Sequence, residues 1–222
     1  METVAKNLLT IQESIPENVT LVAVSKTKPI SDIQKAYNAG QRVFGENKIQ
    51  ELVEKHKKLP KDIEWHMIGH IQRNKVKYMA PFISLIHSAD SYRLIKEINK
   101  QGKINNRVIN CLLQIKIASE ESKFGFTETE ATDFLNSDEY VSFKNIKIVG
   151  LMGMATFTED QKKIDQEFNK LKIFYEKVNR SDSQINILSM GMSDDYPIAI
   201  RNGSTMVRIG SSIFGKRNYI KK

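Results

Sequence analysis

Short apolar runs alternate with amphipathic segments along the whole chain. Eight of the runs are rich in Val, Ile and Leu and have the length of strands. Most of them lack a strict alternation of apolar and polar residues, which is typical of strands buried on both faces. The strands are expected at Thr20–Ser25, Arg42–Phe44, Glu64–Ile68, Leu85–Ser88, Val108–Ile117, Ile146–Met152, Ile185–Ser189 and Met206–Ile209.

Helical patterns fill the intervals between these strands. The segments Glu46–Lys58 and Glu159–Val178 are amphipathic, with apolar residues at helical spacing. Side chains that cap helices, and glycines that end them, indicate further helices. These are expected from a cap at Ser31 to Asn38, from a cap at Asp90 or Ser91 to Lys100, and after a capping box of Thr127 and Glu130.

Strands that alternate with helices predict βα units and a parallel sheet. Eight units are also the number that closes a barrel, and a chain of 222 residues is within the range of that fold. An open doubly wound sheet is the alternative. Polar residues follow nearly every strand instead of gathering at one switch point, which favours the barrel. We therefore predict an α/β protein, a single (β/α)8 TIM-type barrel that forms one domain over residues 1–222.

Composition narrows the class of protein. Hydrophobic residues make up 40% of the chain and charged residues 27%, a soluble globular balance. No apolar run has the length of a membrane span, and the N-terminus lacks a secretory pattern, so we expect no membrane partner and a cytoplasmic location. The single cysteine, Cys111, excludes an internal disulfide, and its apolar surroundings, VINCLLQI, indicate a buried strand residue.

The net charge of +8 fits nucleic acid, a membrane surface or a small anionic ligand. Lysines are interleaved with acids, as in ELVEKHKKLPKD, which is typical of a solvated helix face. The densest basic run, FGKRNYIKK, closes the sequence, and we interpret it as a tail. No zinc-ligand spacing, helix-turn-helix signature or RNA-binding aromatic pattern is present. We expect no metal and no nucleic acid partner, and an RNA-binding module is the least favoured function.

Candidate chemistry begins where the first strand leaves as LVAVSKTKP. Lys26 stands at the C-terminal end of that strand, near the barrel mouth, where desolvation lowers the pKa of a lysine from about 10.4. A neutral amine can form a Schiff base with an aldehyde. From this segment alone, a strand-end lysine that reaches out to solvent is the more common case. Lys28 lies two residues on, but Pro29 places it at the start of the loop.

The second and third strands leave as FGEN and EWHMIGHIQRNK. Gly45 permits an unusual backbone angle, Glu46 is interpreted as a helix cap, and Asn47 can hydrogen-bond a ring substituent. His66 faces inward by alternation, and His70 lies in the loop. A satisfied core or loop histidine is more common than a catalytic one, so neither is assigned a role.

The last two strands leave as LSMGMSDD and VRIGSSIFG. Small and polar residues at the start of a helix leave backbone N–H groups free, an arrangement that favours an anion. Phosphate sites after strands 7 and 8 are a recurrent feature of barrels. Arg208 precedes Gly210 by two residues and therefore points to the same side, where it can hydrogen-bond a heterocycle nitrogen. Pairing of Arg208 with Asp194 or Asp195 is the alternative.

Together these motifs resemble the pyridoxal phosphate homeostasis protein family, which is related by fold to the N-terminal barrel of alanine racemase. The resemblance rests on AVSKTKP, FGEN, WHMIGHIQRNK, SKFG, GLMGM, LSMGMSDD and GSTMVRIGSSIFG, and it runs from about residue 20 to residue 219. It implies that Lys26 holds pyridoxal 5′-phosphate (PLP) as a Schiff base. It further implies a phosphate site at Ser189, Met190, Gly210 and Ser211, a pyridine nitrogen facing Arg208, and a ring lined by Asn47 and Met192.

The resemblance also implies a function without an established catalytic reaction, in intracellular PLP (vitamin B6) and amino-acid homeostasis. PLP-dependent apoenzymes are the recipients that such a role suggests. An alanine-type racemase takes a second base, a tyrosine, from an additional β domain, which we expect to be absent because the sequence ends at Lys222, directly after the eighth unit. We therefore expect a monomeric PLP carrier. The alternatives are a single-domain PLP-dependent amino-acid racemase and a phosphosugar or nucleotide enzyme without PLP.

Overall fold

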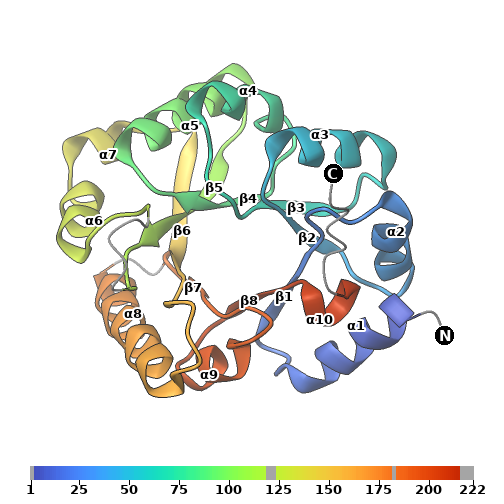
Figure 1. The fold of residues 1–222 in the computed structure, drawn as a ribbon. Helices are drawn as coiled ribbons and strands as arrows, with labels where there is room; N and C mark the ends of the chain where they lie inside the picture. The colour runs from blue at the N-terminus through green and yellow to red at the C-terminus, as the bar shows by residue number, and fades with distance from the viewer. Residues whose placement is uncertain (1–2, 119–123, 182–183, 216–222) are drawn as a thin grey trace, which may run out of the picture.

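Eight parallel strands close into a barrel with the helices outside it (Figure 1). The computed structural model describes residues 3–118, 124–181 and 184–215. The strands are β1 (Thr20–Val24), β2 (Val43–Glu46), β3 (Glu64–Met67), β4 (Leu85–Ala89), β5 (Ile109–Ile115), β6 (Ile146–Gly153), β7 (Ile187–Ser189) and β8 (Met206–Ile209). The strands follow one another in sequence order around the barrel, and β8 pairs with β1. The predicted (β/α)8 barrel is confirmed.

Helices connect the strands on the outside of the barrel. They are α1 (Thr3–Ser14), α2 (Ile30–Asn38), α3 (Ile49–Lys58), the 3-10 turn η1 (Arg73–Lys75), α4 (Val76–Met79), α5 (Tyr92–Ile104), α6 (Glu128–Leu135), α7 (Asp138–Ser142), α8 (Gln161–Ser181), α9 (Tyr196–Arg201) and α10 (Ser211–Phe214). None of the described helices has the length and apolar composition that a membrane crossing requires. The basic run at 216–222 and the first two residues of SKFG lie outside the described residues.

Four helices have boundaries that differ from those predicted. Helix α3 begins at Ile49 instead of Glu46, and α8 runs over Gln161–Ser181 instead of Glu159–Val178. Helix α2 begins at Ile30, because Pro29 is the extended N-cap residue, and Ser31 already lies inside the helix. Helix α5 continues past Lys100 through Gly102. A Cβ at Gly102 would overlap the backbone oxygen of Asn145, so this glycine permits close packing and does not stop the helix.

The capping box predicted at the start of α6 is confirmed. The Glu130 N–H donates to Thr127 Oγ1 at 3.2 Å, and the Thr127 N–H donates to Glu130 Oε2 at 2.7 Å. The two bonds satisfy backbone donors that the helix itself leaves without partners.

The apolar core has two parts. A large cluster fills the layer between the strands and the helices and includes Trp65 and Cys111, both fully buried. A smaller cluster fills the inside of the barrel, where Val22, Leu112 and Met206 are buried. Residues that are paired across two parallel strands point to the same face of the sheet. A residue paired with a member of the interior cluster therefore also points into the barrel.

Candidate functional site

A cavity of about 500 Å³ opens at the C-terminal end of the barrel. Loops after the first, second, third, seventh and eighth strands contribute to its wall. Six of the eight residues predicted for the site line it: Lys26, Asn47, Met192, Arg208, Gly210 and Ser211. Because β8 pairs with β1, Lys26 and the Gly210–Ser211 pair come together although they lie at opposite ends of the sequence.

The turn that carries Lys26 has an unusual backbone. The Lys28 N–H donates to the Ser25 carbonyl at 3.0 Å, which closes a four-residue turn with Lys26 and Thr27 at its centre. Thr27 has a φ of 64°. Glycine or asparagine normally occupies this position of such a turn, because a β-branched side chain is strained at positive φ. Strain of this kind persists where surrounding contacts hold the backbone in place.

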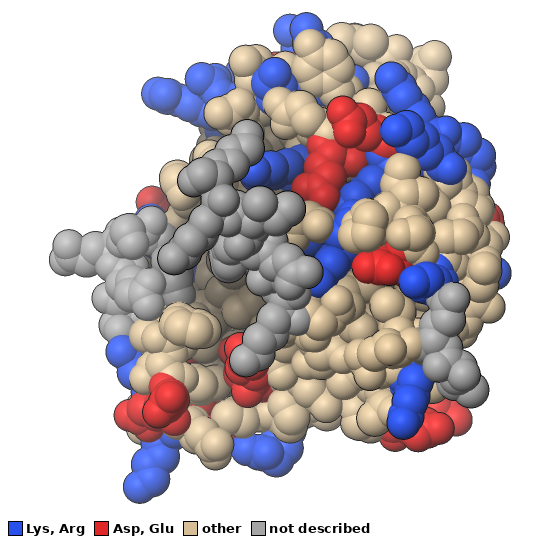
Figure 2. All heavy atoms as spheres, turned by 45° about the vertical axis from the view of Figure 1, so that its right-hand side comes forward, with Lys and Arg blue, Asp and Glu red and all other residues tan. Residues whose placement is uncertain are grey.

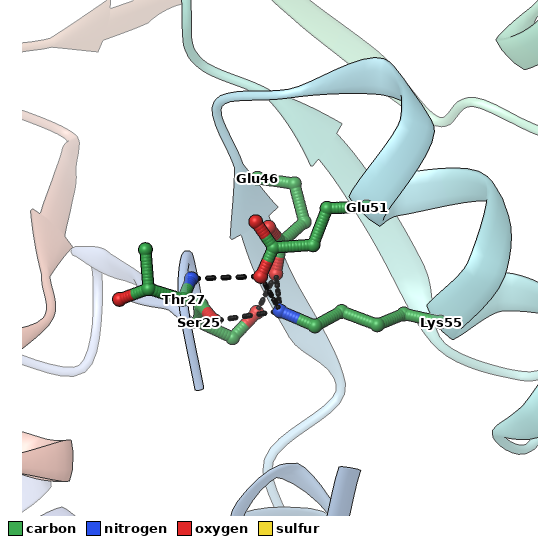
Figure 3. Close-up of polar contacts among 5 residues, drawn as sticks. All are labelled: Ser25, Thr27, Glu46, Glu51 and Lys55. Atoms are coloured by element: carbon green, nitrogen blue, oxygen red, sulfur yellow. Dashed lines mark hydrogen bonds and ion pairs between the residues drawn. The ribbon is translucent and has the colours of Figure 1, made fainter. Parts of the chain in front are cut away.

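Five residues around this turn form a polar group that we call the Lys55 cluster: Ser25, Thr27, Glu46, Glu51 and Lys55 (Figure 3). Lys55 Nζ donates to the Ser25 carbonyl at 2.8 Å, to Glu46 Oε1 at 2.7 Å and to Glu51 Oε1 at 2.6 Å. The Thr27 N–H donates to Glu51 Oε1 at 2.7 Å. The cluster therefore connects α3 and β2 to the backbone on both sides of Lys26.

Glu46 is not a helix cap, as the sequence suggested, but the fully buried last residue of β2. Its Oε1 accepts a hydrogen bond from Ser25 Oγ at 2.5 Å in addition to the one from Lys55. Burial raises the pKa of the Glu46 carboxyl, and the Lys55 ammonium opposes this shift. Gly45 does not adopt a positive φ either. A Cβ at Gly45 would lie 3.0 Å from Val22 Cγ1, so this glycine makes room inside the barrel.

Arg208 points into the barrel, since it pairs with Val22 in the β1–β8 register. Its Nη1 donates to the Ser189 carbonyl at 2.9 Å and to Ser189 Oγ at 2.6 Å, and its Nη2 donates to the Gly153 carbonyl at 3.1 Å. The alternative of an ion pair with Asp194 or Asp195 is not what the described contacts show. The Asp195 carboxylate instead accepts the N–H of Met192 at 2.5 Å.

Two buried histidines continue the polar chain from Arg208. His87 Nδ1 lies 3.1 Å from Ser189 Oγ, and His87 Nε2 lies 3.0 Å from His66 Nδ1. Burial lowers the pKa of His66 to about 3. The pKa of His87 is also far below its usual value, because of burial first and then of His66 and Arg208. Burial lowers the pKa of Arg208 to about 10, with Asp195 opposing. At neutral pH both histidines are therefore uncharged, and Arg208 keeps its charge.

Two of the predicted residues are not brought to the cavity. Ser189 is fully buried, and its hydroxyl contacts Arg208 and His87. The side chain of Met190 is buried in the outer apolar layer, and its N–H donates to the Met206 carbonyl at 3.2 Å. Neither residue lines the cavity: Ser189 lies inside the barrel, and the Met190 side chain lies outside it.

Ser193 lines the cavity although the sequence did not single it out. Its Oγ accepts the N–H of Gly210 at 3.2 Å, so the hydroxyl joins the loop after β7 to the loop after β8. The only signal in the sequence is its place among the small and polar residues of LSMGMSDD, which follow the seventh strand. Ser193, Gly210 and Ser211 thus form the polar edge of the cavity.

His70 lies at the rim of the cavity, whereas His66 lies inside the barrel. His70 Nδ1 is 2.8 Å from Asp90 Oδ2, and its ring stacks on Phe124 with centroids 4.0 Å apart. On the face drawn in Figure 2, basic side chains are interspersed with acidic ones.

Comparison with known proteins places the chain in a family. Residues 1–218 match the model of the alanine racemase N-terminal domain. A relative from Pasteurella multocida, named pyridoxal phosphate homeostasis protein, is 39% identical, and the match covers 99% of this chain and 100% of the relative. The chain belongs to the pyridoxal phosphate homeostasis protein family. An Escherichia coli K12 member of the same name is 35% identical over the full length of both chains.

Solved structures agree with this family assignment. PipY of Synechococcus elongatus, solved with PLP bound, has a TM-score of 0.87 and 31% identity, with 96% of this chain and 100% of PipY covered. An alanine racemase of Clostridium difficile has a TM-score of 0.81 at 14% identity, with 98% of this chain and 60% of the racemase covered. At this low sequence identity, the likeness to the racemase shows a shared fold.

Proposed function

We propose that this chain binds PLP covalently through Lys26 and acts in PLP homeostasis without a catalytic reaction of its own. The observation that carries the proposal is the cavity that joins Lys26 to Arg208, Gly210 and Ser211 across the closure of the barrel. Support comes from relatives that are named for PLP homeostasis and from PipY, whose structure contains PLP. The phosphosugar or nucleotide alternative predicts a colourless protein without a lysine adduct.

The residues around the cavity fit the groups of PLP. Ser193, Gly210 and Ser211 form the edge where polar groups suit a phosphate. The Oδ1 of Asn47 is buried without a hydrogen-bond partner among the described residues, so this amide is available to a ring substituent. Lys26 supplies the amine that bonds the aldehyde. When bound, PLP supplies this aldehyde and an electron-withdrawing ring.

Arg208 supports a binding role over a catalytic one. Its described contacts use three of the five guanidinium N–H donors, which leaves two for a ring nitrogen. With a pKa of about 10, Arg208 donates hydrogen bonds and does not give up its proton at neutral pH. A ring nitrogen that faces it stays unprotonated, which weakens the ring as an electron sink. We propose that the chain carries PLP as a cytoplasmic monomer, with PLP-dependent apoenzymes as recipients.

The covalent site is tested by borohydride reduction of the PLP-treated protein, followed by peptide mass spectrometry. We expect the pyridoxyl label on Lys26 and no visible absorbance band in Lys26→Ala. Lys28→Ala is the matched control, because Lys28 lies in the same turn and its Nζ donates to the Phe214 carbonyl at 2.8 Å. Label on Lys28 or elsewhere, with Lys26 unmodified, would overturn the proposal.

The absence of catalysis is tested separately, with the PLP-loaded protein and a panel of L-amino acids in D₂O. We expect α-proton exchange and racemisation no faster than with Lys26→Ala. Turnover above that control would favour the racemase alternative instead. The paired His70 and Asp90 at the rim would then be the first side chains to replace.

A further inference from the structure

Residues of the Lys55 cluster, outside the cavity, hold the turn that carries Lys26. We propose that Glu51 and Lys55 of α3 are positioning residues, which fix the backbone on both sides of Lys26 and so aim its side chain into the cavity. The inference rests on the proposed function, since it concerns the reactivity of Lys26 toward PLP. Neither Glu51 nor Lys55 lines the cavity, so both act through the backbone.

The strain at Thr27 shows that the turn needs to be held. Its φ of 64° is unfavourable for a β-branched residue, and such a conformation persists only where surrounding contacts hold it. The Thr27 N–H is directed at Glu51 Oε1 at 2.7 Å, a hydrogen bond to a carboxylate. Hydrogen bonds to charged groups are stronger than those between neutral groups, so this contact opposes the strain.

Lys55 holds the other side of the turn. An ammonium group has three N–H donors, and the three acceptors of Lys55 Nζ are the Ser25 carbonyl and one oxygen each of Glu46 and Glu51. The side chain of Lys55 is 6% exposed and that of Glu46 is fully buried, whereas Glu51 is 23% exposed. The same oxygen of Glu51 that accepts the Thr27 N–H is thus fixed by Lys55.

The geometry connects these contacts to Lys26 itself. Ser25 and Thr27 are its two chain neighbours. The Ser25 carbonyl accepts from Lys55, and the Thr27 N–H donates to Glu51. The Ser25 N–H also donates to the Gly45 carbonyl at 3.0 Å, which ties the turn to β2. Figure 3 shows the side chains of Glu51 and Lys55 reaching from α3 to the backbone of this turn. A change in α3 therefore alters the direction in which Lys26 leaves the backbone.

The test compares the rate at which PLP labels Lys26 in matched variants. Glu51→Ala removes the acceptor of the Thr27 N–H. We expect it to slow the labelling of Lys26 about tenfold or more, which is the factor that corresponds to the loss of one hydrogen bond to a charged group. Label at other lysines should rise relative to Lys26. Glu176→Ala is the control, because Glu176 forms an exposed ion pair with Lys172 at the same i,i+4 spacing. Lys26 in this variant should be labelled at the wild-type rate.

A second substitution separates positioning from simple loss of stability. Glycine adopts positive φ without strain, so Thr27→Gly added to Glu51→Ala should restore most of the labelling rate. If the loss of labelling in Glu51→Ala came from general destabilisation elsewhere in α3, relief of the strain at position 27 would not restore the labelling rate. Amide hydrogen exchange of the PLP-free protein gives an independent measurement: the Thr27 N–H should exchange slowly in the wild type and faster in Glu51→Ala.

The possible outcomes are distinct. A wild-type protein that takes no label on Lys26 refutes the proposed function. A labelled wild type together with a folded Glu51→Ala that labels Lys26 equally fast refutes the positioning role alone. If Glu51→Ala fails to fold, Glu51→Gln keeps the shape of the side chain and removes its charge. This variant should label about threefold slower or more, and an unchanged rate would refute the inference.

Discussion

Acid should destabilise this barrel through the two histidines inside it. His66 and His87 are fully buried and lie 3.0 Å apart through ring nitrogens, and burial keeps both uncharged. In the unfolded chain each ring has its usual pKa of 6.5, whereas in the fold the pKa of His66 is about 3. Below pH 6.5 the histidines therefore bind protons in the unfolded state but not in the native state, which favours unfolding.

The size of the effect follows from linkage. One group whose folded pKa is depressed removes about 1.4 kcal/mol of stability per pH unit once the pH is below its unfolded pKa. The two histidines together should remove about 4 kcal/mol between pH 7 and pH 5, after allowing for partial protonation near pH 6.5. That is a large fraction of the about 5–15 kcal/mol by which a protein of this kind is stable.

The assay is urea unfolding of the PLP-free protein at pH 7 and pH 5, followed by the emission of Trp65, the single tryptophan, which is fully buried. Glu46 and Asp195 act in the opposite sense, because burial raises the pKa of each carboxyl and so favours folding at low pH. The comparison with His87→Gln removes their contribution, since both proteins contain them. Between pH 7 and pH 5 this variant should lose about 2 kcal/mol less stability than the wild type, whatever its stability at pH 7.

The result that would refute this reasoning is a pH dependence of unfolding that is the same in His87→Gln and the wild type. It would mean that water or a charge partner lets His87 titrate in the fold. A folded His87 that titrates near pH 6.5 in NMR spectra would contradict the argument independently.

Three further predictions concern other parts of the chain. Gly69→Ala should destabilise the protein by about 1–3 kcal/mol, because a Cβ there would overlap the backbone of Asn47; an unchanged melting temperature would contradict this. Cys111 is buried and burial raises the pKa of its thiol, so a thiol reagent should label it in urea but not in the native protein. Thr127→Ala should cost about 1 kcal/mol through loss of the cap, whereas Thr10→Ala, at an exposed helical position, should not destabilise.

The strands and the barrel could be predicted because burial on both faces leaves a simple signal. Apolar runs of strand length recur between amphipathic segments, and none of the eight observed strands departs from its predicted bounds by more than two residues. Helix α1 was not predicted, although Val4, Leu8 and Ile11 form its buried face at helical spacing. Such a short apolar stripe does not by itself predict a helix, because a helix of this length is stabilised mainly by packing against the rest of the protein.

The candidate site was predictable only in part. The position of Lys26 at a strand end and the glycine after β8 are visible in sequence, and the cavity contains both. The depth of a residue within the barrel is not visible, which is why Ser189 was assigned to the mouth although it is buried below it. Glu51 and Lys55 have the i,i+4 spacing of an ordinary solvated pair, and only the docking of α3 on the turn distinguishes them.

The seam between β1 and β8 has a consequence for synthesis of the protein. Thr20 pairs with Met206, so one wall of the cavity is synthesised well before the other. A growing chain on the ribosome has no complete cavity until its last strand has emerged, and a late, long-range closure is slow. A ligand bound across the seam would then favour the closed barrel over partly folded chains. Supply of the cofactor during translation would thus affect how much of this protein reaches its finished state.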